Sequence, residues 1–175
     1  MAKLVLTVIG DDQSGLVSAL ASVVVNHGGN WEESQMSQLA GKFAGIVLVT
    51  VADAGVDGFL ADLEPLEAEG LLDITAVRAE SDASPEGVVR YRLDLVGTDR
   101  PGIIQDISAA LAARNVSIED LRTETRDAPM AGGQLFEAAA TLVAPADADS
   151  RDLKAAIEDL ANELMVDIDF GTAAG

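Results

Sequence analysis

Short apolar runs and longer helical stripes of apolar residues follow one another along the chain in an order that occurs twice. In the first half the run 4–9 predicts a strand, because branched apolar side chains suit a buried position in a sheet. From Gly15 onward apolar residues recur at helical spacing, which predicts an amphipathic helix ending at the glycine pair 28–29. Further strands are predicted over 30–39, 43–51 and 72–77, and a second helix over 57–69. We expect Pro65 to kink or shorten that second helix.

The second half repeats this order, and an offset of 87 residues aligns the two halves without a gap at their start. The offset pairs Gly10 with Gly97, Asp12 with Asp99, Gly15 with Gly102, and Glu32 with Glu119. The predicted strands of this half cover 91–96, 116–125, 135–143 and 165–170, with helices from 103 to about 114 and over 151–164, and a long hairpin loop over 127–133. The chain therefore contains an internal duplication.

Each half has the order strand, helix, strand, strand, helix, strand, which is the split βαβ arrangement of ferredoxin-like folds. We therefore predict an α+β protein with two such domains, over 1–79 and 89–175, joined by a linker over 80–88. Each domain should hold a four-stranded antiparallel sheet with both helices on one face. A unit of this size with a bare sheet face and two open edges is marginally stable alone. We expect the halves to pack together or to pair their edges.

Charge and composition narrow the range of functions. The chain has 30 acidic and 11 basic side chains, a formal net charge of −19, which repels the phosphate backbone of nucleic acids and anionic lipids. We therefore predict no direct nucleic-acid or membrane partner, and the acidic surface fits either ordinary solubility or high salt. The absence of cysteine excludes disulfides and thiolate chemistry. With no recognisable signal peptide or membrane span, we expect a cytoplasmic protein.

The motif GxDxxG lies in both halves where the first strand ends and the first helix begins. Free amide groups and the helix dipole make such a turn receptive to anions. We expect Asp12 and Asp99 to lie near the N-cap of their helices, where each either simply caps the helix or takes part in a ligand loop. A carboxylate at this place repels an anion but attracts an ammonium group. The motif therefore favours an amino acid over a phosphate.

Other polar residues carry weaker signals. His27 falls in the last turn of a predicted helix, where a structural role is expected. The acidic residues 147, 149 and 152 lack the register of a calcium loop and are interpreted as a solvated helix entry. Trp31 aligns with Ile118 and is interpreted as a core residue. No nucleophile and base form an evident pair, so we predict no catalytic residue, no metal and no cofactor.

The segment GTDRPGII at 97–104 resembles the ligand loop of ACT domains, and GDDQSGLV at 10–17 resembles it more weakly. Nearly the whole chain is similar to tandem ACT-domain proteins of the glycine cleavage system transcriptional repressor family. ACT domains are small regulatory modules that sense amino acids. The resemblance implies ligand-binding residues Asp12, Ser14, Gly15, Leu16 and Asn30 in the first copy, and Asp99, Pro101, Gly102, Ile103 and Ser117 in the second.

The two copies depart from each other at the implied site. The second has Arg100 and Pro101 where the first has Gln13 and Ser14, and it has Ser117 where an asparagine is expected. Because proline restricts the free backbone, we expect the second loop to bind more tightly, although the shorter side chain of Ser117 works in the opposite direction.

The resemblance implies a non-catalytic regulatory protein that binds a small amino acid, such as glycine or serine. Binding would alter the geometry between its ACT units and modulate a partner protein, such as a DNA-binding regulator in the transcriptional control of glycine metabolism. A homodimer is expected. The alternative is a ligand-independent interaction module that recruits partners through its sheet edges, and an enzyme that uses carboxylates alone is a third interpretation.

Overall fold

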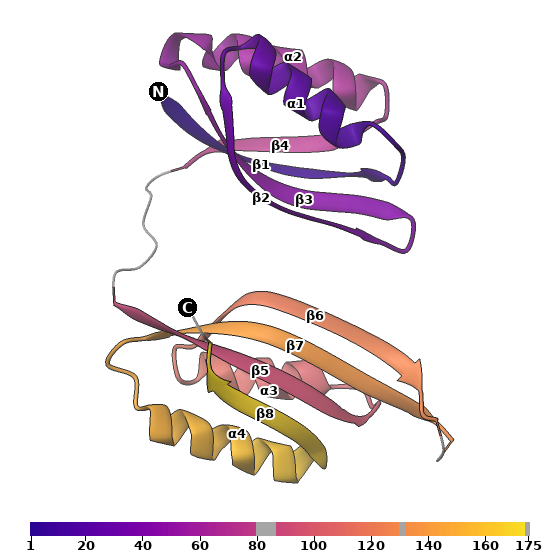
Figure 1. Cartoon of the computed structure of the whole chain (residues 1–175), viewed down its shortest axis with the longest axis vertical. Coiled ribbons are helices and arrows are strands. Elements are labelled where there is room, and N and C mark those ends of the chain that lie inside the picture. The colour runs from indigo at the N-terminus through magenta and orange to yellow at the C-terminus, as the bar shows by residue number, and fades with distance from the viewer. Residues whose placement is uncertain (80–86, 130–131, 174–175) are drawn as a thin grey trace. The chain divides into compact units, whose positions relative to one another are not determined.

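The structure of the chain is a computed structural model that describes residues 1–79, 87–129 and 132–173. Its contacts divide the chain into two compact units, Met1–Asp82 and Ala83–Gly175, so the division falls inside the predicted linker (Figure 1). Residues 80–86 of that linker lie outside the described residues. Val88, which we assigned to the linker, already belongs to the first strand of the second unit.

The two units have the same order of elements and the same sheet topology. The first consists of β1 (Ala2–Asp11), α1 (Leu16–Asn26), β2 (Asn30–Leu39), β3 (Lys42–Val51), a 3-10 turn (Asp53–Gly55), α2 (Val56–Ala68) and β4 (Asp73–Arg78). The second consists of β5 (Val88–Thr98), α3 (Ile103–Ala112), β6 (Ser117–Asp127), β7 (Gln134–Pro145), α4 (Ser150–Leu164) and β8 (Val166–Thr172). The sheet orders are β2-β3-β1-β4 and β6-β7-β5-β8, with every neighbouring pair antiparallel. The predicted ferredoxin-like α+β fold is confirmed in both halves.

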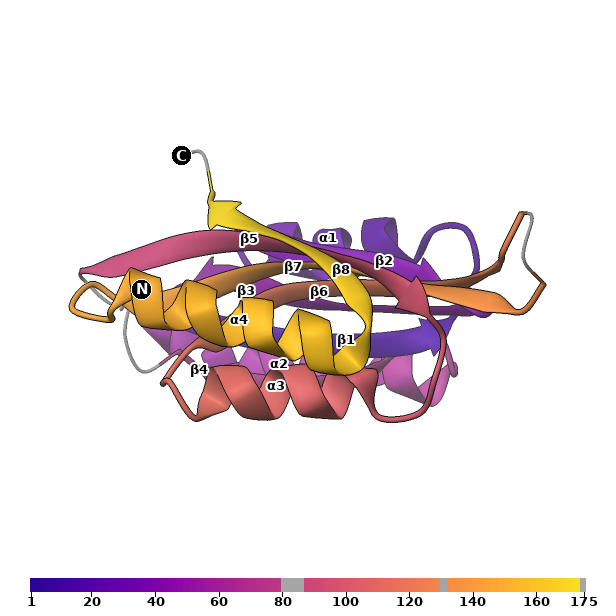
Figure 2. The same ribbon diagram turned by 90° about the horizontal axis from the view of Figure 1, so that it is seen from below.

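Both helices of each unit cover one face of its sheet, and Figures 1 and 2 show this for α3 and α4. Alternate residues of a strand point to opposite faces. In β1 the buried positions are Ala2, Leu4, Leu6 and Val8, and they belong to the core that the sheet forms with α1 and α2. The intervening positions point away from the helices. Each sheet therefore has one face in a core and one open face.

One local prediction differs from the structure. Helix α2 runs through Pro65 to Ala68, so the proline does not shorten it. A proline removes a single amide donor, and the carbonyl of Pro65 still accepts a hydrogen bond from the Glu69 amide at 2.9 Å. The end of α3 agrees with the prediction, because Asn115 makes the turn after it in a left-handed conformation (φ 55°). Met130 and Ala131 of the predicted loop lie outside the described residues.

The edge strands β2 and β6 contain matching bulges. Pairing with β3 shifts between Trp31 and Glu33, and pairing with β7 shifts between Ile118 and Asp120. The extra residue is a glutamate in both units, Glu32 and Glu119, which explains why the duplication aligns them. Each bulged glutamate forms an ion pair with a basic residue of the central strand. The N–O distances are 3.6 Å for Lys3–Glu32 and 2.7 Å for Arg90–Glu119.

Candidate ligand site

The loop that follows the first strand has the same conformation in both units. Gly15 (φ 97°, ψ −7°) and Gly102 (φ 96°, ψ −6°) are the N-cap residues of α1 and α3, in the left-handed region that favours glycine. Neither helix has a side-chain capping hydrogen bond from the described residues. The interpretation of Asp12 and Asp99 as helix caps is therefore wrong, because a glycine occupies the N-cap position in each unit.

Backbone amides without an acceptor in their own helix lie at both turns. The first helical hydrogen bonds run from the Ala19 amide to Gly15 and from the Asp106 amide to Gly102, both at 2.9 Å. The amides at 16–18 and 103–105 precede these bonds and have no acceptor within their helix. They point out of the positive end of the helix dipole, where an anionic group is stabilised.

The amides of Asp12 and Asp99 already have partners. They donate to the carbonyls of Gly41 and Gln134, at 2.9 and 2.8 Å, and so extend the pairing of β1 with β3 and of β5 with β7 beyond the strand end. Their carboxylates remain exposed beside the turn. Each aspartate is therefore fixed by its backbone while its side chain faces solvent, where it could meet an ammonium group.

The remaining loop residues of the implied site differ in the exposure of their side chains and therefore in the contacts that they can make with a ligand. Ser14 and Pro101 are exposed. Leu16 and Ile103 are only 4% and 2% exposed, because their side chains belong to the two cores. These two residues can therefore contribute a backbone amide to a ligand but no side-chain contact.

The structure does not bring Asn30 or Ser117 together with the loop of the same unit. Asn30 pairs with Thr50, which pairs with Lys3 at the start of β1, whereas the loop follows Asp11 at the end of β1. Eight residues of strand separate these ends, or about 26 Å at about 3.3 Å per residue. Ser117 is placed in the same way, opposite Val143 and thus Arg90. One amino acid cannot touch both groups within a single unit.

A shallow hollow of about 620 Å³ lies beside the second loop, between the start of α3 and the end of α4. It is lined by Arg100, Asp106, Ala109, Leu160, Glu163, Leu164 and Met165. The guanidinium of Arg100 lies 3.5 Å from the carboxylate of Asp106. The hollow thus places groups of both charges beside apolar side chains, which is the chemistry that a zwitterionic amino acid requires.

Sequence reasoning noted Arg100 as a departure between the copies but missed the rest of this hollow. Asp106 stands in the first turn of α3, so its distance from the loop was available from helical spacing. Glu163 and Met165 come from the other end of the unit, and no sequence signal places them there. Packing of α4 against α3 brings them to the loop.

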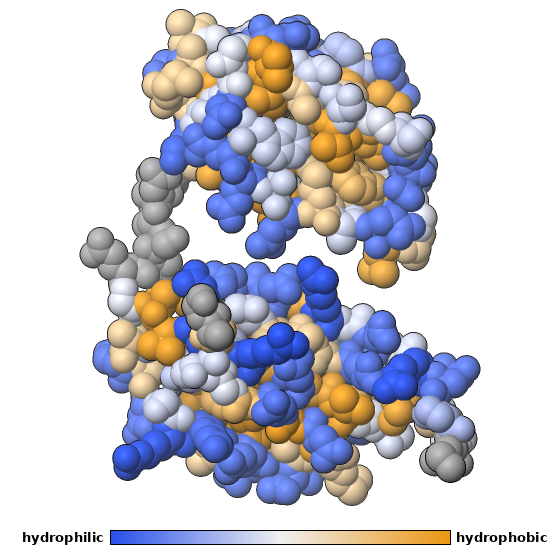
Figure 3. Space-filling model, in the orientation of Figure 1, coloured by the Kyte–Doolittle hydropathy of each residue, from blue (hydrophilic) through white to orange (hydrophobic). Residues whose placement is uncertain are grey.

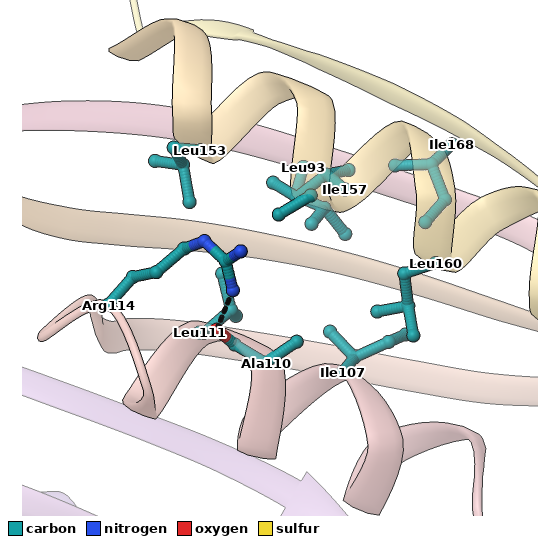
Figure 4. A pocket seen from close by; sticks show the side chains of 10 residues that line it. Leu93, Ile107, Ala110, Leu111, Arg114, Leu153, Ile157, Leu160 and Ile168 are labelled. Carbon is teal, nitrogen blue, oxygen red and sulfur yellow. Dashed lines mark hydrogen bonds between the residues drawn. The ribbon is translucent and has the colours of Figure 1, made fainter. Parts of the chain in front are cut away.

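A second hollow lies in the core of the same unit and is too small for a ligand. Figure 4 shows side chains of α3, α4, β5 and β8 that point into it, among them Ile107, Leu153 and Ile168. Its volume is about 10 Å³, at most the room that one water needs. Arg114 closes one end, where it donates hydrogen bonds to the Ala110 carbonyl at 3.3 Å and to Asp152 at 3.0 Å. We interpret this hollow as a packing gap.

The other singled-out residues have structural contacts. His27 follows α1, with Nε2 2.8 Å from the Asp62 carboxylate and its ring edge-on to Phe59 at 5.8 Å. Asp149 is the N-cap of α4 and accepts from the amides of residues 151 and 152, which confirms the helix-entry interpretation of that acidic segment. Trp31 packs against the first core, as predicted. Within the described residues no cluster of histidine and carboxylate side chains suits a metal, and no helix is long and apolar enough to span a membrane.

Most of the chain is similar to known proteins. The ACT domain family model matches residues 2–77 and 93–171. The glycine cleavage system transcriptional repressor of Escherichia coli (strain K12) is 27% identical over 165 residues, which cover 92% of this chain and 85% of the repressor. The crystal structure of an unknown protein from Galdieria sulphuraria is 32% identical, with a TM-score of 0.86 over 99% of both chains. A candidate glycine cleavage system transcriptional repressor shares the fold at 16% identity, with a TM-score of 0.74 over 99% of this chain and 98% of that one.

Proposed function

Since the chain belongs to the ACT-domain family through both of its halves, we propose that it is a non-catalytic regulatory protein that binds a small amino acid. The family match and the similarity to a transcriptional repressor support a regulatory, ligand-binding role. In this proposal the protein acts in the cytoplasm and modulates a partner protein. We propose a DNA-binding regulator of glycine metabolism as that partner, because the E. coli relative is a glycine cleavage system repressor.

The observation that carries the proposal is the hollow beside the second loop. Arg100 supplies a positive group for a carboxylate, and Asp106 and Glu163 supply negative groups for an ammonium. The amides that begin α3 add donors on the same loop. We infer that the second unit binds the ligand through the charged groups common to all amino acids. We propose a small one such as glycine or serine, because the E. coli relative is a glycine cleavage system repressor.

Regulation requires that the ligand bind two states of the protein unequally. The charged groups in the hollow come from α3 and its preceding loop and from the end of α4. A ligand held by both helices therefore favours the arrangement in which its two sets of partners are correctly spaced. Ligand binding therefore changes the relative populations of the two arrangements. A partner protein that binds only one of these arrangements then responds to the ligand.

Calorimetry of the full chain against the twenty amino acids tests the proposal. We expect glycine or serine to bind, and the change Arg100→Ala to lower that affinity by roughly 10-fold to 150-fold, because a hydrogen bond to a charged group contributes about 1.5–3 kcal/mol. Two controls are matched to this change. Gln13→Ala alters the equivalent position of the first loop, and Arg122→Ala removes an arginine from elsewhere in the second unit. Loss of binding in either control, with binding retained in Arg100→Ala, would place the ligand elsewhere.

A ligand-independent interaction module is the second candidate function. The edge strands β2 and β6 have almost entirely exposed side chains, so their free edges could accept a strand from a partner. The same calorimetric panel separates the candidates. If no amino acid produces heat or a melting shift, partner binding at the edges of β2 and β6 becomes the favoured function.

We also expect no measurable affinity for duplex DNA near physiological salt. The formal charge of −19 opposes approach to the phosphate backbone, so any transcriptional effect must pass through a protein that itself binds DNA. An electrophoretic mobility shift assay with the purified protein checks this. A shift that appears with the protein alone and disappears on addition of salt would contradict the expectation.

A further inference from the structure

The open face of the first sheet is apolar. Ile46 and Val77 are each 54% exposed and Ile9 is 49% exposed, all on the side away from the helices. Strand pairing places Val5 between Leu48 and Val77 across the three strands β3, β1 and β4. Ile46 lies in the next row of the same face and Ile9 in the row after it. The face is therefore a continuous patch, which soluble proteins rarely leave uncovered.

The centre of this face carries no charge. In the next row Thr7 lies between Ile46 and Thr75. Charged side chains surround this centre. Lys3 pairs with Glu32 and Lys42 pairs with Asp11 at its two ends, and Glu33 and Asp73 lie on the edge strands, opposite Leu48 and Ile9. In Figure 3 apolar and hydrophilic side chains are interspersed on the visible surface of both units.

The corresponding face of the second sheet is charged at the same positions. Arg92 stands where the first unit has Val5, and Asp94 and Asp169 stand where it has Thr7 and Thr75. Arg92 donates hydrogen bonds to Asp94, which holds the pKa of that carboxyl below its usual value. Arg90 lowers the pKa of Glu119 in the same way. The duplicated domains thus share a fold but differ in the chemistry of their open faces.

An occupant of the apolar face must itself be uncharged at its centre, because burying an ionised pair against aliphatic side chains costs more than the pair returns. The open face of the second unit does not meet this requirement. A second copy of the first sheet does meet it, since it presents the same threonine and aliphatic rows. Each end of the face carries one lysine–carboxylate ion pair. Two copies whose strands run in the same or in opposite directions therefore both place positive and negative groups opposite each other.

The size of the face also suits association with a second copy. Three strands of ten residues and one of six, about 4.8 Å apart, present about 570 Å². Stable interfaces bury about 800 Å² on each partner, and weaker ones somewhat less. Two sheets stacked face to face form the two layers of a sandwich about 10 Å apart, with aliphatic side chains between them.

We propose that two copies of this chain associate through the open faces of their first sheets, related by a two-fold axis near Thr7 and Ile46. The interface is isologous, so each copy contributes the same residues. This assembly is independent of amino-acid binding, because the hollow that carries that function lies in the second unit. It leaves both ligand loops and all sheet edges available to other partners.

Light scattering after size-exclusion chromatography gives the first test. We expect the full chain to have twice the mass of its 18.1 kDa monomer, and Ile46→Arg to shift the mass to that of the monomer. The matched control Ala139→Arg introduces the same charge at the equivalent position of the second sheet and should remain dimeric. A wild-type protein that is monomeric at its highest attainable concentration overturns the proposal. So does a dimeric, folded Ile46→Arg variant.

Cross-linking gives a second test that requires no disruptive substitution. Because the chain has no cysteine, Thr7→Cys and Asp94→Cys each introduce a single thiol, at equivalent positions of the two sheets. A short bis-maleimide should link Thr7→Cys into a covalent dimer and leave Asp94→Cys monomeric on a denaturing gel. The reverse pattern, or equal yields, would show that copies do not meet through the first sheet.

Discussion

Replacing Gly10 with alanine is expected to lower the free energy of unfolding of the first unit by about 3 kcal/mol, at the upper end of the usual cost of overpacking. A Cβ atom at this position would lie 2.2 Å from the carbonyl oxygen of Leu71 and 3.2 Å from the side chain of Leu72. The oxygen belongs to the backbone that leads into β4, so it cannot rotate away. For a unit of this size the expected fall in melting temperature is roughly 12 to 24 °C.

Thermal unfolding followed by circular dichroism measures this effect, with Gly55→Ala as the matched control. Gly55 has open space around its would-be Cβ and an ordinary φ of −98°, so alanine there should be neutral or slightly stabilising. A Gly10→Ala protein that melts within a few degrees of the wild type would show that β4 can move away from β1 at little cost.

The change Phe59→Ala is expected to be at least as damaging, with a loss of about 3–5 kcal/mol. Phe59 is fully buried in the first core, where truncation leaves a cavity that the surrounding β-sheet and helices cannot fill. Its ring also packs edge-on against His27. We therefore expect the signals of the single histidine to shift in the NMR spectrum as the stability falls.

Chemical denaturation of Phe59→Ala and Leu60→Ala separates burial from a general effect on helix α2. Leu60 is the next residue of the same helix but is 37% exposed, so its truncation should cost about 1 kcal/mol or less. Equal losses in the two variants would contradict the packing described for the first core.

The two copies of the duplicated domain have diverged in different places. The first has an apolar open face and a loop with uncharged Gln13 and Ser14, and the second has a charged open face and Arg100 beside a hollow. Both retain the same backbone at the turn, with φ values of 97° and 96° at Gly15 and Gly102. This pattern is consistent with assembly through the first unit and ligand binding through the second.

The order and type of the elements could be predicted from the sequence because they depend on local periodicity. Apolar spacing of two and of 3.6 residues separates strands from helices, and the offset of 87 residues allowed each half to support the assignment of the other. Even the polar strand β2 was expected over the residues that form it, 30–39. Its exposed position at the sheet edge explains its weak apolar signal.

The roles of the motif residues could be predicted only in part. The motif GxDxxG correctly located the turn, but of the two roles considered for its aspartates the helix cap is excluded, because the second glycine occupies the N-cap position. The first glycine is required by a close approach to a distant segment, at Leu71 in one unit and at Val166 in the other. Such a contact involves residues far apart in sequence, and periodicity contains no information about it.

The sequence by itself determined the duplicated fold, the position of both GxDxxG loops and the residue types available there. Tertiary structure decided which of these residues meet. It separated Asn30 from Asp12 by the length of β1, because α1 returns the chain to the opposite end of the sheet. It brought Glu163 to Arg100 through helix packing, and it aligned Val5, Leu48 and Val77 into one face through strand register. Local patterns define faces and turns, whereas only pairing and packing between distant segments place them side by side.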